Sequence, residues 1–352
     1  MESISIVVLS ILICVFANEF NEFTSSNNLF AASIYKEIVK SNEKNFLVSP
    51  FSAETILTLA QFGARGETAR ELQTALCLPD DHDKIESSIK SLLPTLKGND
   101  NYSLHVANKI YVKQGCTLKG EFQRVAADVF NAGLENIDFS QNAAAASKMN
   151  NWVAEQTANK IHDLISKDSL DDDTRAVLIN ALYFKGNWSE QFDKRGTRNR
   201  NFYENEKDSI MVETMHDPSG LYNYYEDAEL KAKFLEVSLK DPSISMTFIL
   251  PSEREGLASL EGHVEKVFLP RKYSYEQVNV ALPRFKIESK LNCKEILRKL
   301  GVKKAFVDGQ ADFSGVSDED LAIDEVIQKT FIEVSEDGVE AAAATEVGMN
   351  LF

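Results

Sequence analysis

The chain has 352 residues, of which 43% are hydrophobic and 26% are charged, so it is long enough to bury a large globular core. It contains no Pro/Gly/Ser-rich linker, no low-complexity tract and no repeat period, which favours a single domain. The formal net charge of −16 argues against binding to nucleic acid or to another polyanion.

The first seventeen residues, MESISIVVLSILICVFA, contain a mostly apolar run that is too short to span a membrane. Val15 and Ala17 are small residues at the spacing that a signal peptidase prefers, although Glu2 stands where a positive charge is expected. We therefore predict that residues 1–17 are a secretory signal, in preference to a buried first strand. The predicted mature protein starts at Asn18, is secreted and has no membrane segment.

Three cysteines remain after Cys14, which lies in the predicted signal. Cys77, Cys116 and Cys293 are scattered along the chain and show no spacing typical of a metal site or of a disulfide framework. They allow one bridge at most, and buried free thiols are the favoured interpretation. The stability of the fold must therefore come from its core.

The first half of the chain has the pattern of a helical region. Phe30, Ile34 and Ile38 are spaced four apart, so they share one face of a predicted helix. Residues 51–66 are apolar almost all round, which predicts a buried helix that ends at Gly63.

Two more helices are predicted in this half. Thr68 and Glu71 have the spacing of a capping box, and Pro79 should stop the helix that they begin. Residues 143–165 predict one long amphipathic helix. Its apolar face would consist of Met149, Trp152, Val153, Ile161, Leu164 and Ile165.

Strands dominate the second half. Residues 176–184 form a nearly continuous apolar run, as in a central strand that is covered on both faces. Residues 245–251, 279–288 and 325–334 also predict strands, and residues 291–302 predict a helix. Helices come first and strands later, without strict alternation, so we predict an α+β fold.

No pattern along the chain indicates catalysis. The five histidines occur in no metal-binding or metalloprotease arrangement, and the nucleophile elbow, the P-loop and the dinucleotide fingerprint are all missing from the sequence. The acidic runs at 80–83 and 171–173 are typical of solvated turns and helix N-termini rather than metal loops. We therefore predict a protein that is not an enzyme and that needs no metal or cofactor.

The last residues, Val339 to Phe352, alternate with period 2. One face carries Val339, Ala341, Ala343, Thr345, Val347, Met349 and Leu351, and the other carries Glu340, Ala342, Ala344, Glu346, Gly348, Asn350 and Phe352. This alternation predicts a strand with one buried face of small side chains, which could slide between two existing strands without overpacking the core. An alanine-rich helix fits the pattern poorly, and a disordered end remains an alternative.

This segment resembles the hinge and reactive loop of a serpin, a serine protease inhibitor. In that family a glutamate, a variable residue and a glycine precede a run of alanines and a threonine. The matching residues here are Glu336, Asp337, Gly338, Ala341, Ala342, Ala343, Ala344 and Thr345, with Val339 and Glu340 between them. Val339 stands where the family usually has threonine or serine.

The resemblance extends along the chain. NFLVSPFSAETIL is similar to an early family signature with Ser49 and Ser52, and LINALYFKGNW is similar to the central strand with Asn180 and Trp188. NWVAEQTANKIHDLI resembles the helix across the main sheet, and LPRFKIE resembles another strand. Gln328 stands where many members have a histidine near the point of sheet opening. The resemblance implies the serpin fold, with helices on a large mixed sheet and two further sheets, and the details favour secreted insect haemolymph members of the antichymotrypsin and antitrypsin type.

Family spacing places the scissile bond after the fourteenth residue beyond Gly338, which is Phe352. A serpin normally continues for a few dozen residues that build core strands. We therefore expect residues 18–352 to be one serpin domain that lacks these strands, either as the large piece of a cleaved inhibitor or as a truncated sequence. A cleaved form would keep its own C-terminal fragment as a partner.

The resemblance implies a suicide-substrate mechanism. A target serine protease attacks the bond after Phe352 and forms an acyl-enzyme, and the loop then inserts into the main sheet with the protease attached. Phe352 fits a chymotrypsin-like pocket, and so would Leu351 if the loop were offset by one residue. Elastase-like and cathepsin-G-like proteases are alternative targets.

Other functions remain as alternatives. A non-inhibitory serpin, such as a carrier, storage protein or chaperone, would share the fold, and a secreted hydrolase has no motif to support it. The predicted protein is a monomer that binds a protease and neither nucleic acid nor membrane. Of the two sequons, Asn101 resembles a glycosylated loop site, whereas Asn187 stands beside a tryptophan that we expect to be buried.

Overall fold

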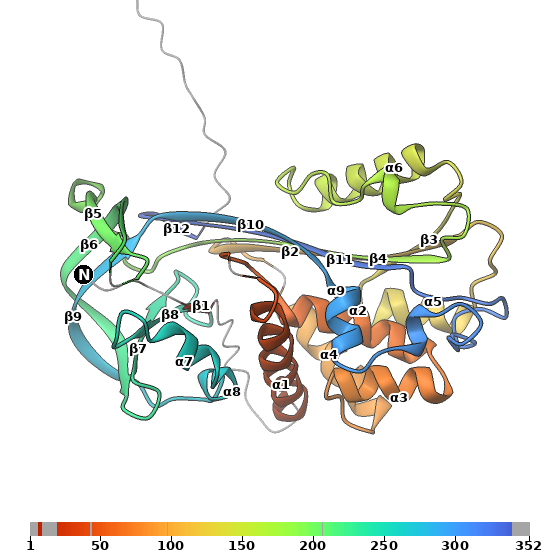
Figure 1. Cartoon of the computed structure of the whole chain (residues 1–352), viewed down its shortest axis with the longest axis horizontal. Helices are drawn as coiled ribbons and strands as arrows, with labels where there is room; N and C mark the ends of the chain where they lie inside the picture. The colour runs from red at the N-terminus through yellow and green to blue at the C-terminus, as the bar shows by residue number, and fades with distance from the viewer. Residues whose placement is uncertain (1–5, 9–19, 43, 97, 206, 340–352) are drawn as a thin grey trace, which may run out of the picture.

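The computed structural model describes residues 6–8, 20–42, 44–96, 98–205 and 207–339. A main sheet crosses the molecule, with α6 on one face and most other helices on the opposite face (Figure 1). The main sheet has the order β10-β11-β12-β4-β2-β3. Its strands are β10 (Phe285–Asn292), β11 (Glu325–Ser335), β12 (Gly338–Val339), β4 (Ala176–Asn187), β2 (Tyr102–Lys113) and β3 (Gly133–Ile137).

A second sheet stands at one end of the main sheet, with the order β1-β8-β7-β6-β5 and with β9 also paired to β6. Its strands are β1 (Ile6–Val8), β8 (Ser245–Pro251), β7 (Ala232–Ser238), β6 (Ser209–Asp227), β5 (Arg198–Tyr203) and β9 (Ser274–Pro283). The arrangement confirms the predicted α+β fold with a mixed central sheet.

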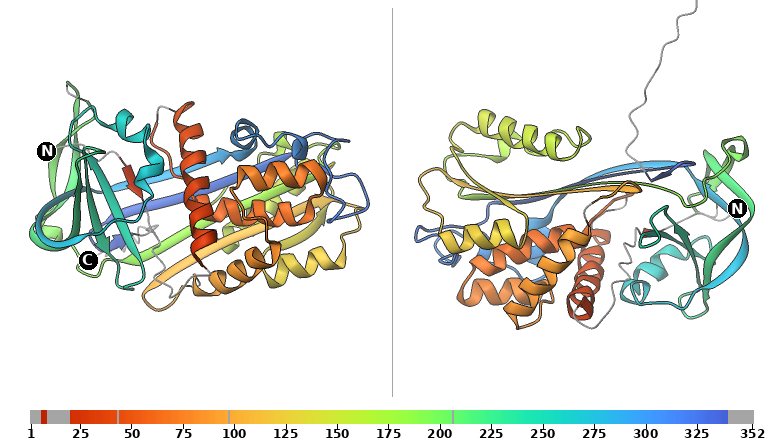
Figure 2. Two further views of the ribbon diagram at one scale, coloured as in Figure 1. Left: turned by 90° about the horizontal axis from the view of Figure 1, so that it is seen from below. Right: turned by 180° about the vertical axis from the view of Figure 1, so that it is seen from behind.

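Helices cover both sheets, and the view from below in Figure 2 shows α1 running across the strands of the main sheet. They are α1 (Phe20–Val39), α2 (Pro50–Gly63), α3 (Gly66–Ala75), α4 (His82–Thr95), α5 (Gly120–Asp128), α6 (Asn142–Gln156), α7 (Leu257–Glu261), α8 (Val264–Val267) and α9 (Cys293–Lys299). Among the described residues, none of these helices is both long enough and apolar enough to cross a bilayer.

The centre of the main sheet follows the predicted pattern. β4 is buried along nearly its whole length, pairs antiparallel with β2 and pairs parallel with β11. The parallel pairing runs from Glu325 opposite Val177 to Phe331 opposite Tyr183. As predicted, α2 is buried nearly throughout and ends at Gly63, and Phe30, Ile34 and Ile38 of α1 are buried.

The predicted helix over residues 143–165 is too long. α6 ends at Gln156 because Ala158 and Asn159 take positive φ values of 50° and 57°, which break the helical ladder. The second apolar group of the prediction, at Ile161, is still buried against the sheet, but it lies in an irregular segment after the helix. The apolar pattern therefore predicted correctly which residues are buried, but the helix that it predicted is too long.

The predicted capping box is also wrong. α3 begins at Gly66, so Thr68 lies inside the helix, where its Oγ1 accepts a hydrogen bond from the backbone N–H of Asp312 (3.0 Å). Glu71 accepts hydrogen bonds from the backbone N–H groups of Lys303 and Lys304 instead of closing the cap. Both side chains have partners far away in the sequence, which a local pattern does not reveal. The helix ends at Ala75, before the predicted stop at Pro79.

The strand predicted over residues 279–288 is two strands in two sheets. β9 ends at Pro283, which has no N–H to continue a ladder, and β10 begins at Phe285. At the other end of the chain, β1 pairs antiparallel with β8 at the edge of the second sheet. β1 lies within residues 1–17, and the secretory signal stays a prediction.

Candidate functional site

The predicted hinge lies at the end of the main sheet where β11 and β4 separate. The chain turns after Ser335 and returns as β12, which lies between these two strands and is antiparallel to both (Figure 1). Val339 pairs with Val334 on one side and with Gly186 on the other. β12 therefore occupies the first positions of a gap that would have to open between β11 and β4 for the strand to continue.

Trp188 anchors the turn between β11 and β12. Its backbone N–H donates to the Asp337 carbonyl (3.1 Å), and its indole Nε1 donates to the Ser335 carbonyl (2.8 Å). Trp188 is 1% exposed, so the indole that makes the second bond is itself part of the core. The sequence placed Trp188 near the sheet opening, and the structure brings it directly to the hinge.

Glu336 is a buried carboxylate in the same turn. Thr197 Oγ1 donates to its Oε1 (2.6 Å), Arg284 Nε lies 3.5 Å from its Oε2, and the glutamate side chain is 7% exposed. The backbone N–H of Phe192 donates to the Glu336 carbonyl (3.1 Å). These contacts hold the hinge in place, and replacing Arg284 would leave the buried Glu336 carboxylate without its cation.

Gly338 is required by close packing. A Cβ at this position would lie 2.2 Å from the Gly186 carbonyl oxygen and 2.6 Å from the Asn187 Cα. Both are backbone atoms that have no freedom to move aside. The glycine of the family pattern is therefore the residue that allows β12 to enter between its neighbours.

Val339 fixes the orientation of the strand. Its side chain is fully buried in a cluster that includes Phe184, Leu239 and Ile332, on the face of the main sheet opposite α6. The next residue along a strand points to the other face. The predicted hinge residues Glu340, Ala341, Ala342, Ala343, Ala344 and Thr345 and the predicted reactive-site Phe352 lie outside the described residues.

A buried polar network joins β11 to β4 where these strands pair directly. Gln328 Nε2 donates to Asn180 Oδ1 (2.6 Å) and to the Ser49 carbonyl (2.9 Å), and Gln328 Oε1 accepts from the Ser49 N–H (2.9 Å). Asn180 Nδ2 in turn donates to Ser52 and to Asn108 Oδ1 (2.7 Å). The structure thus brings together Ser49, Ser52, Asn180 and Gln328, and glutamine supplies the hydrogen bond to Asn180.

This network contains no side chain that titrates near neutral pH, so replacing Gln328 with histidine should make stability depend on pH. Neutral histidine can accept from the Ser49 N–H, but a protonated ring donates from both nitrogens and leaves that N–H unpaired. Folding therefore favours neutral histidine, and stability should be full above about pH 6.5 and fall at lower pH.

The measurement is the melting temperature of Gln328→His against the unmodified protein at about pH 7.5 and about pH 5.5. We expect the deficit to be about 2 °C larger at the lower pH, because one pH unit below the pKa is worth about 1.4 kcal/mol and a chain of this length shifts by about 1–2 °C per kcal/mol. Gln328→Leu is the control, because it also loses the hydrogen bonds but does not titrate. A deficit for the histidine variant that is equal at both pH values would contradict the interpretation.

Sequence reasoning missed three residues of this site. Asn108 is a buried polar residue among apolar neighbours in β2. A polar residue within an apolar strand pattern could have marked it as part of a buried hydrogen-bond network. Thr197 and Arg284 gave no signal, because they reach Glu336 from elements that are distant in the sequence.

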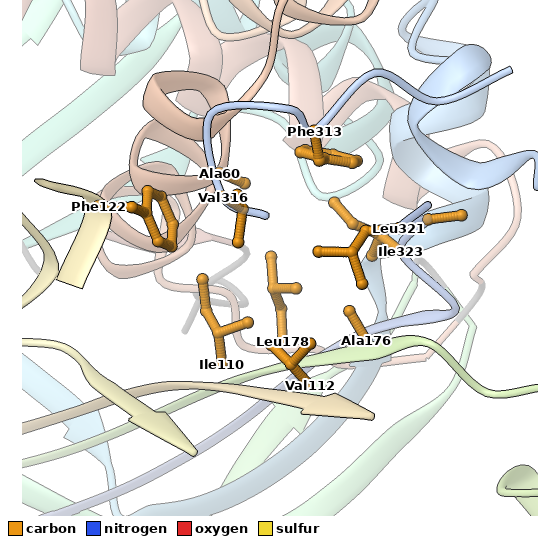
Figure 3. Close-up of a pocket in the computed structure, with 11 residues that line it drawn as sticks. Ala60, Ile110, Val112, Phe122, Ala176, Leu178, Phe313, Val316, Leu321 and Ile323 are labelled. Carbon is orange, nitrogen blue, oxygen red and sulfur yellow. The ribbon is translucent and has the colours of Figure 1, made fainter. Parts of the chain in front are cut away.

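Cavities of different size lie beneath the main sheet. One of about 30 Å³ is entirely apolar and is lined by residues such as Ile110, Leu178 and Phe313 (Figure 3). The other, of about 600 Å³, lies between α1, the main sheet and the second sheet, with Phe184, Phe234 and Ile249 among its walls. Within the described ranges, no group of three or more His, Cys, Asp and Glu side chains could hold a metal ion.

The family model described as Serpin (serine protease inhibitor) matches residues 25–352. The chain is a serpin. The Bombyx mori protein named Antitrypsin is 38% identical over 94% of this chain and 86% of its own length, and Antichymotrypsin-2 of the same organism is 39% identical over 93% and 88%.

A solved structure has the same fold. Serpin48, described as a highly specific serpin in the insect Tenebrio molitor, superposes with a TM-score of 0.88 at 47% identity, covering 94% of this serpin and 91% of that chain. The family description names inhibition of serine proteases rather than catalysis, so the partners that the family implies are target serine proteases. The predicted family is confirmed, including its similarity to insect members.

Proposed function

We propose that this serpin is a secreted inhibitor of chymotrypsin-like serine proteases that acts as a suicide substrate. The target's catalytic serine attacks the carbonyl carbon of Phe352, the peptide bond after it breaks, and the departing segment takes the proton as a new N-terminus. The loop, still esterified to the protease, then inserts between β4 and β11.

The position of β12 is the observation that carries this proposal. Two strands that pair parallel can accept a third strand antiparallel to both, and β12 already pairs with each of them in that direction. The residues that follow are small on the face that would be buried. Insertion would add a ladder of backbone hydrogen bonds on both sides of the loop. The uncleaved inhibitor would therefore be kinetically trapped, and these hydrogen bonds would drive insertion once the loop is cleaved.

The proposed specificity rests on Phe352, and the proposed secretion rests on residues 1–17. The Phe352 side chain would fit the apolar specificity pocket of a chymotrypsin-like protease. It would not fit the acidic pocket of a trypsin-like protease, which binds a basic side chain. Residues 1–17 would direct secretion. Asn101 lies in a turn and is partly exposed, so it would accept a glycan; Asn187 is exposed although Trp188 is buried, and its backbone contacts the hinge.

The large cavity supports a further part of the proposal. Its apolar walls come from α1, α8 and both sheets, and curated relatives extend beyond the matched region. We propose that the domain over residues 18–352 is completed by apolar strands that follow the scissile bond, which a cleaved inhibitor would keep as a bound fragment. That fragment should co-purify with the cleaved protein under native conditions.

The test is to incubate the full-length protein with chymotrypsin, trypsin and elastase and to analyse the products on a denaturing gel. We expect a complex with chymotrypsin that resists SDS, and sequencing of the released fragment should place the cut after Phe352. Cleavage without a covalent complex for any protease would favour a non-inhibitory serpin instead. A cut after Leu351 would keep inhibition and correct the position of the reactive site.

A further inference from the structure

Lys109 of β2 lies between the main sheet and α6, with a side chain that is only 12% exposed. β2 pairs parallel with β3, and the register places Lys109 opposite Gly133. A Cβ at position 133 would lie 3.0 Å from Lys109 Cγ and 3.1 Å from its Cδ. The glycine therefore leaves room for the lysine side chain to pass over β3.

Three side chains surround the Lys109 ammonium group. Its Nζ lies 2.6 Å from Glu135 Oε2, and it lies 4.8 Å and 4.9 Å from the ring centroids of Tyr111 and Trp152. Trp152 belongs to α6, whereas Tyr111 and Glu135 belong to β2 and β3. A cation that is shielded from water is attracted to aromatic rings, and the carboxylate balances its charge. These four residues, which we call the lysine cage, join α6 to the main sheet.

The rest of the α6 interface is built mostly from small side chains. The buried residues of α6 are Ala145, Ala146, Met149, Val153 and Ala154. Three of these are alanines, whose small apolar area gives little stabilisation on burial. Lys148 of α6 also forms a salt bridge with Glu135, but the Lys148 side chain is 57% exposed, so this pair contributes little. The lysine cage therefore supplies a large share of what holds α6 on the sheet.

The segment after α6 lies across the seam between β4 and β11. Asn150 Nδ2 donates to the Ile165 carbonyl (2.9 Å), and Asn150 Oδ1 accepts from the Ile165 N–H (2.8 Å), so this segment is fixed to α6. Ile165 belongs to the same apolar cluster as Ile179 of β4 and Ile327 of β11. A strand that entered between β4 and β11 would place half of its side chains on this side, beneath the segment. The segment would then have to lift, and α6 would have to lift with it.

We propose that Lys109 is a positioning residue that pins α6 to the main sheet, and that through α6 it sets the rate at which the sheet admits an inserting strand. Lifting α6 would part Trp152 from the Lys109 ammonium group, so the contacts of the lysine cage add to the barrier. Before insertion, the same contacts keep the segment after α6 on the seam. This inference rests on the proposed function, because insertion is the step that would require α6 to lift.

The experiment compares the full-length protein with Lys109→Met, which keeps the length of the side chain and removes its charge. Hydrogen exchange in α6 of the uncleaved variant, measured by mass spectrometry, should be about fivefold faster or more, while exchange in α2 should stay the same. Stopped-flow mixing of chymotrypsin with saturating inhibitor gives the limiting rate constant of protease inactivation, which should rise about threefold or more. Lys109→Arg keeps the charge and should keep both values close to those of the unmodified protein.

Two controls keep the result specific. Lys148→Met removes the exposed salt bridge to the same glutamate and should change neither readout. Ile85→Val in α4 lowers the overall stability from the face of the main sheet opposite α6 (Figure 1), and it should leave exchange in α6 unchanged.

Unchanged exchange in α6 of Lys109→Met would overturn the pinning of α6. Faster exchange with an unchanged rate of inactivation would overturn its link to insertion. If the unmodified protein formed no SDS-resistant complex with chymotrypsin, the proposed function would fail and the link to insertion with it. The exchange measurement would then still decide whether Lys109 holds α6.

Discussion

Replacing Ala343 with arginine should convert the protein from an inhibitor into a substrate that chymotrypsin cleaves and releases. If the strand continued in the register of Gly338 and Val339, position 343 would be level with Leu182 and Thr330, on the same face as the buried Val339. An arginine there would have to enter the core unpaired, which costs several kcal/mol. Insertion would slow, and each 1.4 kcal/mol added to its barrier would shift the competition about tenfold towards hydrolysis of the acyl-enzyme.

The measurement is the fraction of chymotrypsin held in the SDS-resistant complex, together with the moles of inhibitor consumed per mole of protease inactivated. We expect the complex to fall about tenfold or more, while the cleaved product accumulates. Ala343→Ser is the matched control, because a small neutral side chain at the same position carries no charge into the core and should leave complex formation intact. Full complex formation by Ala343→Arg would contradict the burial of this face.

Replacing Glu54 with glutamine should stabilise the protein, by an amount that grows with pH. Glu54 of α2 is fully buried, Asn27 donates to its Oε2, and its Oε1 has no partner. No lysine or arginine of the described residues forms a salt bridge with it. Burial therefore raises the pKa of this carboxyl from 4.5 to about 8.

The sign of the effect follows from the raised pKa. Below about pH 4.5 the carboxyl is neutral in both the folded and the unfolded chain, so it costs nothing. As the pH rises towards 8 the unfolded chain ionises first, and the free energy of unfolding falls until the folded carboxyl ionises as well. At about pH 9 the penalty should reach about 2–5 kcal/mol, and glutamine avoids it because the amide does not ionise.

Melting temperatures measured from about pH 4 to about pH 9 test this account. Glu54→Gln and the unmodified protein should coincide at the acidic end, and the variant should melt several degrees higher at the alkaline end. Glu155→Gln, on an exposed position of α6, is the control and should follow the unmodified protein throughout. A stabilisation that does not vary with pH would argue against the ionisation of Glu54 as its cause.

The sequence predicted the strands that define the site because β4 is a nearly continuous apolar run and β11 is rich in β-branched residues. β4 and β11 were found within a few residues, and the alternation after Gly338 indicated which face of the tail is small. Helix ends were less predictable. α6 stops where Ala158 and Asn159 adopt positive φ, and neither residue type requires that conformation.

The contacts that hold the hinge could not be predicted from local pattern. Glu336 meets Thr197 and Arg284 only after the second sheet and the main sheet have come together. No sequence pattern near these residues predicts that contact. The hydrogen-bond partners of Gln328 could not be predicted from the sequence either. The family resemblance marked its position, but only the fold shows that an amide can serve Ser49 and Asn180 at once.

The most direct test of the whole account is a crystal structure of the protein cleaved after Phe352. We predict that the strand beginning at Gly338 then continues between β11 and β4, with its first alanines facing the core. The direct parallel pairing of β11 with β4, in which Gln328 lies opposite Asn180, should be lost. A cleaved molecule in which β4 and β11 remain paired as they are here, with the tail outside the sheet, would contradict the central claim that cleavage drives insertion.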